Sequence, residues 1–230
     1  MKDIIFNLIP ELKGKNDDYT DAIIRRFKDY IEYSQIPEIC LGFDDNTIIP
    51  DKLDKVVNNM LIAVKERYNF LFNFSSYENL SYLSYLLIAY YFKQCILNDE
   101  TVENILYIDT KLMVEDYKRL INYDKNELSL APVHSLETLY KNIENAPLVI
   151  WDKFMMIDSA YDKDKIYDIL CIRHRKGLAN FYFSINGTSE LSKVMGPNIS
   201  NEICQYLDTG FNCSLNKINI KHTKEVSLFK

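Results

Sequence analysis

The chain has 230 residues and a formal net charge of −6 at pH 7, and hydrophobic residues make up 47% of it. A hydrophobic fraction of this size supplies a core and excludes an intrinsically disordered chain. The acidic balance excludes nucleic-acid binding through bulk charge, although it leaves room for a local basic patch.

The first predicted element is an amphipathic helix within residues 15–34. Its apolar side chains, among them Phe27, Tyr30 and Ile31, recur at helical spacing. Because an amphipathic helix docks readily in a groove of another protein, we expect these three residues to contact a partner.

A second helix is predicted to open at Pro50 and Asp51, and from there strands and helices alternate. Apolar strands that are separated by helices are typical of a parallel sheet covered on both faces. Strands are predicted at 68–72, 104–108, 148–152 and 179–185, with a closing strand that ends near residue 220. Helices are predicted at 80–97, 110–121, 135–143, 164–176, 189–195 and 199–207.

This order predicts an α/β protein with two parts. A short helical arm over residues 1–35 precedes a three-layer domain over residues 36–230, whose five-stranded sheet is mostly parallel. The most apolar stretch, residues 80–92, is too short to span a bilayer. The five scattered cysteines favour free thiols in a reducing compartment, and no secretory signal is found in the first ten residues. We therefore expect a cytoplasmic protein without a membrane partner.

A polar stretch, residues 73–79, joins the first predicted strand to a long apolar helix, which is the layout of a nucleotide-binding loop. Such a loop needs glycines so that backbone N–H groups can wrap phosphate, and then a lysine and a serine or threonine for phosphate and magnesium. From Phe43 to Lys176 the chain has no glycine. The layout of an ATPase is present, but the phosphate-binding residues are missing.

Eight short segments follow one another along the chain and together carry a resemblance that none of them carries alone: 34–38, 71–73, 106–109, 147–154, 167–175, 181–186, 190–191 and 196–199. This order resembles the AAA+ ATPases that load the bacterial replicative helicase, the DnaC/DnaI type. The resemblance covers about residues 34–220. It implies that the three-layer domain is a P-loop-NTPase (AAA+)-like domain.

The nucleotide-site positions that this resemblance assigns are degenerate. The P-loop lysine position falls on Asn79, and Asn73 stands near one of the absent glycines. Asp152 occupies the Walker B position, but Lys153 replaces the catalytic carboxylate that normally follows. Asn186 matches the sensor-1 position, and the arginine region contains no arginine.

Phosphoryl transfer depends on positioning and on charge neutralisation by a loop, a lysine, a metal ion and an arginine. Because four of the family's catalytic parts are altered together, we predict a pseudo-ATPase rather than an enzyme, with no cofactor and no metal site. Asn73, Asn79, Asp152 and Asn186 are then vestiges of a nucleotide site.

The densest basic cluster lies at the end of a predicted helix and contains Arg173, His174, Arg175 and Lys176. The helix dipole alone favours cations there, and contact with DNA phosphate or an acidic partner is the other interpretation. Arg173, Arg175 and Lys176 are thus candidate contacts. Cys171 lies one turn from His174, but without a third group to activate a thiol we expect a buried cysteine and an exposed histidine.

The resemblance implies an accessory DNA-replication protein, from a phage or another mobile element, that binds a replicative helicase, a loader or an initiator without an ATP cycle. Such a protein could recruit the helicase, or occupy a subunit position in an oligomer. Two alternatives stay open. One is an NTPase whose unusual phosphate site uses Asn79, Ser75 or Ser76 and Asp152, and the other is an inhibitory or structural module with no role on DNA.

Overall fold

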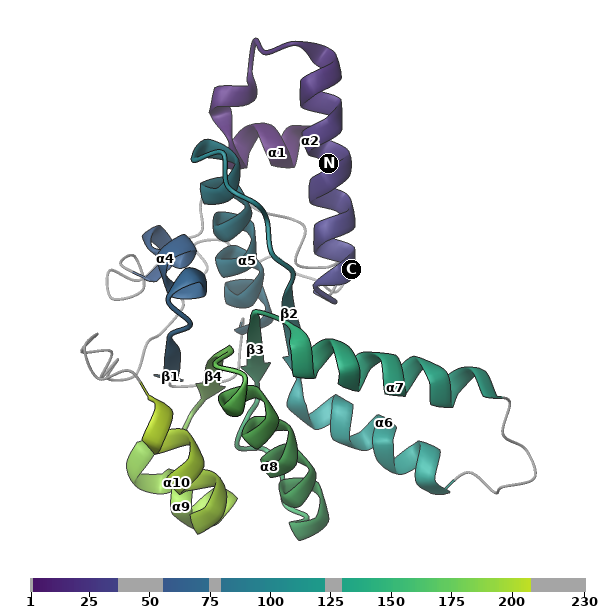
Figure 1. The fold of residues 1–230 in the computed structure, drawn as a ribbon, viewed down its shortest axis with the longest axis vertical. Coiled ribbons are helices and arrows are strands. Elements are labelled where there is room, and N and C mark those ends of the chain that lie inside the picture. The colour runs from purple at the N-terminus through teal and green to yellow at the C-terminus, as the bar shows by residue number, and fades with distance from the viewer. Residues whose placement is uncertain (1, 37–55, 75–79, 123–129, 208–230) are drawn as a thin grey trace, which may run out of the picture.

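The computed structural model describes residues 2–36, 56–74, 80–122 and 130–207. Its strands form one parallel sheet in the order β1-β4-β3-β2 (Figure 1). The strands are β1 Asn69–Asn73, β2 Ile105–Asp109, β3 Leu148–Asp152 and β4 Ala179–Ser184. The predicted parallel α/β architecture is confirmed, and each described strand begins and ends within one residue of its predicted range. The predicted fifth strand lies outside the described residues.

Helices precede the sheet and connect its strands. They are α1 Lys2–Leu8, α2 Asp17–Tyr33, α4 Met60–Lys65, α5 Leu80–Leu97, α6 Thr110–Asn122, α7 Leu130–Asn145, α8 Ala160–Arg175, α9 Thr188–Met195 and α10 Pro197–Tyr206, with a 3-10 turn at Pro10–Leu12. Helix α5 has the predicted bounds. The predicted start of α7 at residue 135 was wrong, because Pro132 lies in its first turn, where a missing N–H is tolerated.

The sheet lies between two hydrophobic clusters, because successive side chains of a strand point to opposite faces. Ile150 and Phe181 belong to one cluster, with α2, α4 and α5. Trp151 and Tyr182 belong to the other, with α8, α9 and α10. Figure 1 shows α5 and α8 on opposite sides of the sheet, as the predicted three layers require.

Helix α5 is buried on nearly every side. Of its 18 residues, 12 are buried, and they are distributed around the helix axis rather than along one stripe. A helix that is apolar all round belongs in the centre of a domain. None of the helices in the described part of the chain combines the length and apolarity needed to cross a membrane.

The N-terminal arm packs onto α5 through the residues that we expected to contact a partner. Phe27, Tyr30 and Ile31 are each 5% exposed or less, and the Phe27 ring lies 5.0 Å from the ring of Phe92. The prediction of a free docking face was therefore wrong for these three residues. At the end of the arm, the backbone N–H of Tyr107 donates to the Ser34 carbonyl over 2.9 Å, which joins the arm to β2.

Candidate nucleotide site

The carboxyl ends of the strands bring the predicted site residues to one edge of the sheet. Asn73 ends β1, Asp152 ends β3, and Asn186 follows β4 by two residues. Asp109 ends β2 and is the register partner of Asp152. Ligands of open α/β sheets bind at this edge. Asn79 lies outside the described residues.

Asp152 accepts a hydrogen bond at each carboxylate oxygen. The Tyr107 hydroxyl donates to Oδ2 over 2.7 Å, and the Lys153 backbone N–H donates to Oδ1 over 2.7 Å. The side chain is buried, with the residue 1% exposed. Both donors belong to the chain itself, so the carboxylate is already held by the protein.

Asp109 is held in the same way. Its Oδ1 accepts from the Leu112 backbone N–H over 3.1 Å, which caps the N-terminus of α6. Its Oδ2 forms an ion pair with the Lys153 ammonium, and 10% of the Asp109 side chain is exposed. All four oxygens of the two neighbouring carboxylates thus have donors from within the chain.

Lys153 adopts a backbone conformation that is unusual for its residue type. Its φ of +53° lies in the left-handed region, which costs a non-glycine residue about 1 kcal/mol. This turn aims the backbone N–H at Asp152 and the ammonium at Asp109. The resemblance assigns a catalytic carboxylate to this position, whereas in the structure the lysine places a positive charge beside the two aspartates.

Burial raises the pKa of the Asp152 carboxyl above its ordinary value. The Tyr107 hydroxyl and the Lys153 charge lower this pKa in part, and the nearby Asp109 charge raises it. A magnesium ion prefers near-octahedral oxygen ligands and keeps several of its waters. The bonded carboxylates and the adjacent ammonium therefore do not fit a magnesium–nucleotide complex.

The two asparagines of the predicted site lie at the β1 and β4 end of this edge. The Asn73 side-chain amide donates to the Ile185 carbonyl over 3.5 Å, and the Asn186 backbone N–H donates to the Ser184 hydroxyl over 3.0 Å. Because β4 separates β1 from β3, Asn73 stands two strand spacings from Asp152, roughly 10 Å. The two asparagines thus lie at one end of this edge, and the hydrogen-bonded Asp152 and the ion-paired Asp109 lie at the other.

The basic cluster is not the exposed surface that we expected. Arg173 is fully buried, and its guanidinium donates to the carbonyls of Ile143, Ala146 and Ala179 and to the side-chain oxygen of Asn180. Burial lowers its pKa to about 9, so it stays protonated at neutral pH. The carbonyls at the end of α7 are the negative end of a helix dipole, which favours this cation. The prediction that Arg173 contacts DNA was wrong.

Arg175 and Lys176 are exposed, and each also has a hydrogen bond within the chain. Arg175 donates to the Cys171 carbonyl over 3.0 Å, and Lys176 donates to the Asn145 side chain over 2.9 Å. Both residues precede β4 and therefore lie near the amino ends of the strands. Asp152 lies at the opposite edge of the sheet, where the strands end. Their contact with DNA or a partner stays a prediction.

His174 is buried, although we expected it to be exposed. Its Nδ1 lies 2.9 Å from Glu202 Oε1, its Nε2 lies 3.2 Å from the Tyr182 hydroxyl, and its ring stacks on Tyr206. Burial lowers the pKa of the imidazole, although Glu202 raises it in part. Both ring nitrogens are engaged by groups other than Cys171, which removes the basis for an activated thiol.

The helical pattern of the sequence could have predicted that Arg173 and His174 are buried. The buried residues of α8 recur at intervals of three and four, which is the spacing of one helix face. Arg173 and His174 continue this face, whereas Arg175 and Lys176 leave it. The buried residues of this face are Asp162, Ile166, Ile169, Leu170, Arg173 and His174.

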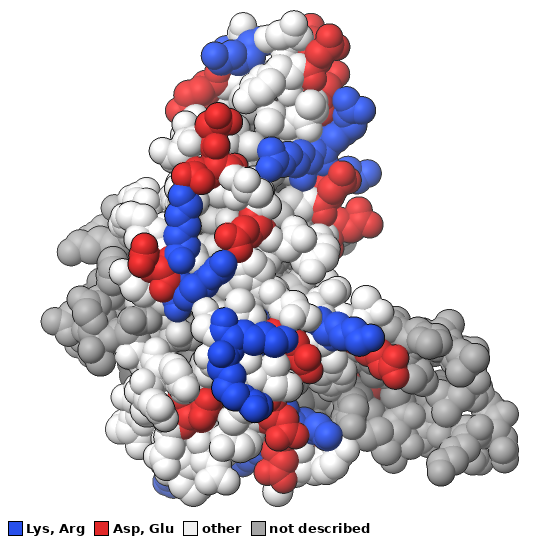
Figure 2. Space-filling model, in the orientation of Figure 1, with Lys and Arg blue, Asp and Glu red and all other residues white. Residues whose placement is uncertain are grey.

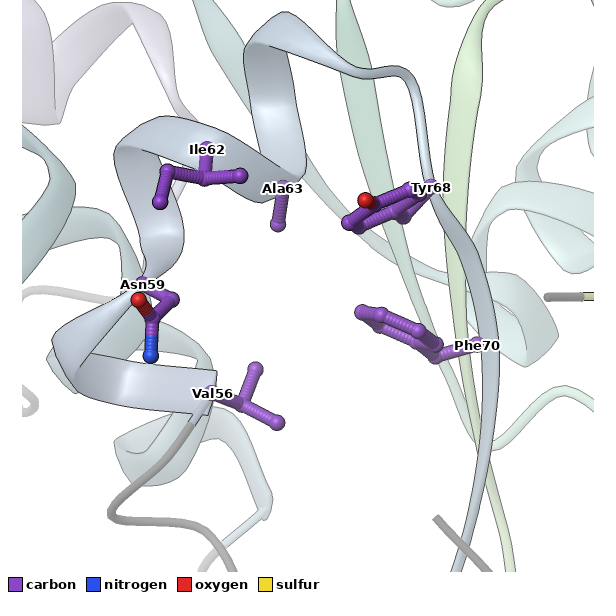
Figure 3. A pocket seen from close by; sticks show the side chains of 6 residues that line it. All are labelled: Val56, Asn59, Ile62, Ala63, Tyr68 and Phe70. Carbon is purple, nitrogen blue, oxygen red and sulfur yellow. The ribbon is translucent and has the colours of Figure 1, made fainter. Parts of the chain in front are cut away.

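Two hollows open in the described part of the chain near the strands. Figure 3 shows the smaller one, a notch of about 10 Å³ where Val56 and Ala63 lie opposite Tyr68 and Phe70. This volume holds one water molecule at most. The larger, of about 220 Å³, lies beside β2. The described residues contain no group of three or more His, Cys, Asp or Glu side chains placed to bind a metal ion.

Charges of both signs are mixed on the face that Figure 2 shows, where lysines and arginines lie among aspartates and glutamates. Lys65 pairs with Glu100 over 2.5 Å, and Arg67 pairs with Glu103 over 3.2 Å. Nucleic-acid binding through phosphates calls for a basic stripe or patch. The mixed charges on this face of the described surface form no such stripe.

The fold is similar to those of two solved structures, one of which is a helicase loader. Among solved structures, the crystal structure of the DnaC helicase loader matches with a TM-score of 0.51 and 13% identity, over 77% of this chain and 96% of that chain. The crystal structure of DnaI matches with a TM-score of 0.50 and 14% identity, over 83% of this chain and 90% of that chain. The sequence matches no family model and no curated protein.

Proposed function

We propose that this chain is an accessory DNA-replication protein of the cytoplasm, in which a helicase-loader fold binds a replication partner without hydrolysing ATP. The likeness to DnaC and DnaI supports the fold on which this proposal rests. The absence of hydrolysis is inferred from Asp109 and Asp152, which we call the closed pair of carboxylates because all four of their oxygens accept donors from within the chain. One of these donors is the Lys153 ammonium.

Hydrolysis needs a metal ion that bridges the nucleotide phosphates and a group that positions the attacking water. Here Asp152 is occupied by Tyr107 and by the backbone of Lys153. The residue after Asp152 is a lysine, which in its protonated form accepts no proton. These residues supply structure rather than catalysis, so the protein acts by binding.

The partner that we propose is a ring-shaped replicative helicase, or the initiator or loader that acts with it. One of the matched structures is that of a helicase loader, and we extend that role to this chain. Because Phe27, Tyr30 and Ile31 are buried, we expect the partner to bind a surface other than this face of α2. DNA contact through Arg175 and Lys176 remains part of the proposal.

Affinity purification of the tagged chain from its native host tests this role. Recovery of a ring helicase or an initiator as the main co-purifying protein is the expected result. The same complex is expected in equal yield after apyrase treatment and after addition of Mg·ATP, because the proposed binding has no ATP cycle. Recovery of an unrelated metabolic or membrane protein, or a complex that forms only with ATP, would contradict the proposal.

A further inference from the structure

His174 joins three elements of the described chain at one buried imidazole. It lies in the last turn of α8, and its side chain is 1% exposed. Nδ1 lies 2.9 Å from Oε1 of Glu202 in α10, and Nε2 lies 3.2 Å from the hydroxyl of Tyr182 in β4. The ring also stacks on Tyr206, the last residue of α10, with 4.3 Å between the ring centroids. Because Glu202 and Tyr206 are one helical turn apart, the end of α10 contacts the imidazole at two points.

The chemistry of its partners determines the protonation state of this imidazole. A carboxylate only accepts hydrogen bonds, so Nδ1 carries a hydrogen and donates it to Glu202. A neutral imidazole has one N–H, which leaves Nε2 as an acceptor for the Tyr182 hydroxyl. Burial raises the pKa of the Tyr182 hydroxyl, so this group keeps its proton at neutral pH. The neutral ring with its hydrogen on Nδ1 therefore satisfies both partners.

A second proton on the imidazole does not fit this site. It would turn Nε2 into a donor, and the Tyr182 hydroxyl would then lose its acceptor. Tyr182 is fully buried, and the described residues offer its hydroxyl no second hydrogen bond. Leaving a buried hydroxyl without a partner is unfavourable. Protonation therefore weakens the contacts that hold the end of α10.

The charges around the ring do not compensate for this loss. The titratable groups that face the ring come from the same three elements: Glu202 and Tyr206 of α10, Tyr182 of β4, and Tyr167, Cys171 and Arg173 of α8. One carboxylate and one guanidinium are thus the charged members of this set. Burial lowers the pKa of His174, the Glu202 carboxylate raises it in part, and the Arg173 charge lowers it further.

Helix α10 depends on this junction because it is the last described element. Among the described elements it packs against α9 and α8. Its apolar contacts run through Ile199 and Ile203, and its polar contact with α8 runs through Glu202 and His174. We propose that His174 is a pH-sensitive latch, which holds α10 on α8 and β4 when neutral and loosens α10 when protonated. Neither ATP nor a replication partner enters this inference, so it can fail separately from the proposed function.

Nuclear magnetic resonance of the full chain labelled with ¹⁵N tests the protonation state. His134→Gln and His222→Gln, made together, leave His174 as the single histidine, so that its ring signals are assigned directly. At pH 7.5 we expect a hydrogen on Nδ1 and none on Nε2. A hydrogen on Nε2 at this pH, alone or together with one on Nδ1, would overturn the inference. This measurement needs no change at the latch itself.

Hydrogen exchange of the full chain tests the release of α10. Protection factors are corrected for the intrinsic exchange rate at each pH, so that only the opening of the structure is compared. The amides of residues 203–206 are expected to lose protection about tenfold between pH 7.5 and about pH 5, because a buried hydroxyl loses its partner. They are also expected to be less protected than the amides of α5 at the lower pH. Equal protection of α10 and α5 there would mean that α10 opens only with the whole protein, which contradicts a local latch.

Two variants separate the latch from a general effect of acid. His174→Gln has no group that titrates in this range, and the protection of α10 is expected to change less than about twofold between the two pH values. In Glu202→Gln the amide oxygen still accepts the Nδ1 hydrogen, but the negative charge that favours a second proton is gone. Its α10 is therefore expected to be released at a lower pH than that of the unmodified chain. A tenfold loss that persists in His174→Gln, or release of Glu202→Gln at a higher pH, would refute the latch.

Discussion

At the residue scale, several charged side chains of the described residues form bonds within the chain, and Arg173 forms the largest number of them. Arg173 joins the end of α7 to the start of β4 through four acceptors. One of these acceptors, the Asn180 side-chain oxygen, also accepts from the Trp151 indole over 3.1 Å, and the Asn180 amide donates to Asn69 over 2.9 Å. This network crosses three neighbouring strands, so a buried arginine and a buried asparagine fix how the sheet meets its helices.

Replacing Arg173 therefore tests structure rather than DNA binding. Arg173→Ala leaves several buried acceptors without a donor, and we expect it to lower the free energy of unfolding by about 3 kcal/mol or more. Arg175→Ala, two residues along the same helix, changes an exposed side chain and is expected to stay within about 0.5 kcal/mol. Urea titrations followed by fluorescence of Trp151, the single tryptophan, measure both. Equal effects of the two variants would contradict the structural role.

His174 gives the stability of the protein a dependence on pH. Because burial lowers its pKa in the folded state, the unfolded chain binds the proton more tightly. The contribution of His174 to stability is fully present above the ordinary pKa near 6.5 and is lost as pH falls through the folded-state value. We expect the difference in unfolding free energy between the unmodified chain and His174→Gln to shrink between pH 7.5 and about pH 5. A difference that is constant over this range would contradict a neutral, buried imidazole.

Removal of the Lys153 charge tests the closed pair of carboxylates. The Lys153 side chain is 33% exposed, so the pair lies between a surface ion pair and a buried one. Lys153→Met is expected to lower the free energy of unfolding by about 1 to 3 kcal/mol, because Asp109 and Asp152 then face each other without a cation. Lys111→Met breaks an exposed pair and is the control, with an expected change below about 0.5 kcal/mol. A Lys153→Met effect no larger than the control would refute the role of the ammonium.

At the element scale, the sequence was informative where a helix or strand is apolar along its length. Helix α5 and strand β3 have the bounds that their apolar runs predicted. For α2, the periodicity correctly identified a face that is covered, but a periodic pattern contains no information about what covers it. The covering element proved to be α5 of the same chain, through Tyr91 and Phe92.

The packing of α2 on α5 contains one unsatisfied group. The Tyr30 hydroxyl is buried, and it has no hydrogen-bond partner among the described residues. Tyr30→Phe removes this group and keeps the ring, so we expect the free energy of unfolding to rise by about 1 kcal/mol. Tyr91→Phe is the matched control, because the Tyr91 hydroxyl accepts the Glu103 N–H over 3.1 Å, and its removal is expected to destabilise the protein. Thermal unfolding measures the change in stability of both variants, which we expect to be an increase for Tyr30→Phe and a decrease for Tyr91→Phe. A loss of stability in Tyr30→Phe would contradict the account.

The candidate site could be predicted only in part, for a physical reason. The place of Asp152 at the end of a buried strand follows from the apolar run before it. Its donors could not be predicted, because Tyr107 and Asp152 are 45 residues apart in sequence and meet only through the pairing of β2 with β3. The contact between Lys153 and Asp109 depends in addition on a left-handed turn at a residue type that rarely adopts one.

At the scale of the whole molecule, a fold similar to those of DnaC and DnaI is combined with two strand-end carboxylates that are bonded within the chain. The parallel sheet and its two helical layers match DnaC and DnaI over most of the chain, at identities of 13% and 14%. A core tolerates extensive replacement when the pattern of apolar residues is kept, whereas a phosphate site tolerates little. A fold of this kind can therefore persist without a working phosphate site, as the proposed function requires.

Calorimetric titration of the purified full-length chain with Mg·ATP tests the closure of the nucleotide edge most directly. We expect no saturable binding with a dissociation constant below about 1 mM, for the unmodified chain and for Asp152→Ala alike. Saturable binding tighter than about 1 mM that disappears in Asp152→Ala would contradict this closure, because the carboxylate at the end of β3 would then be a working nucleotide ligand.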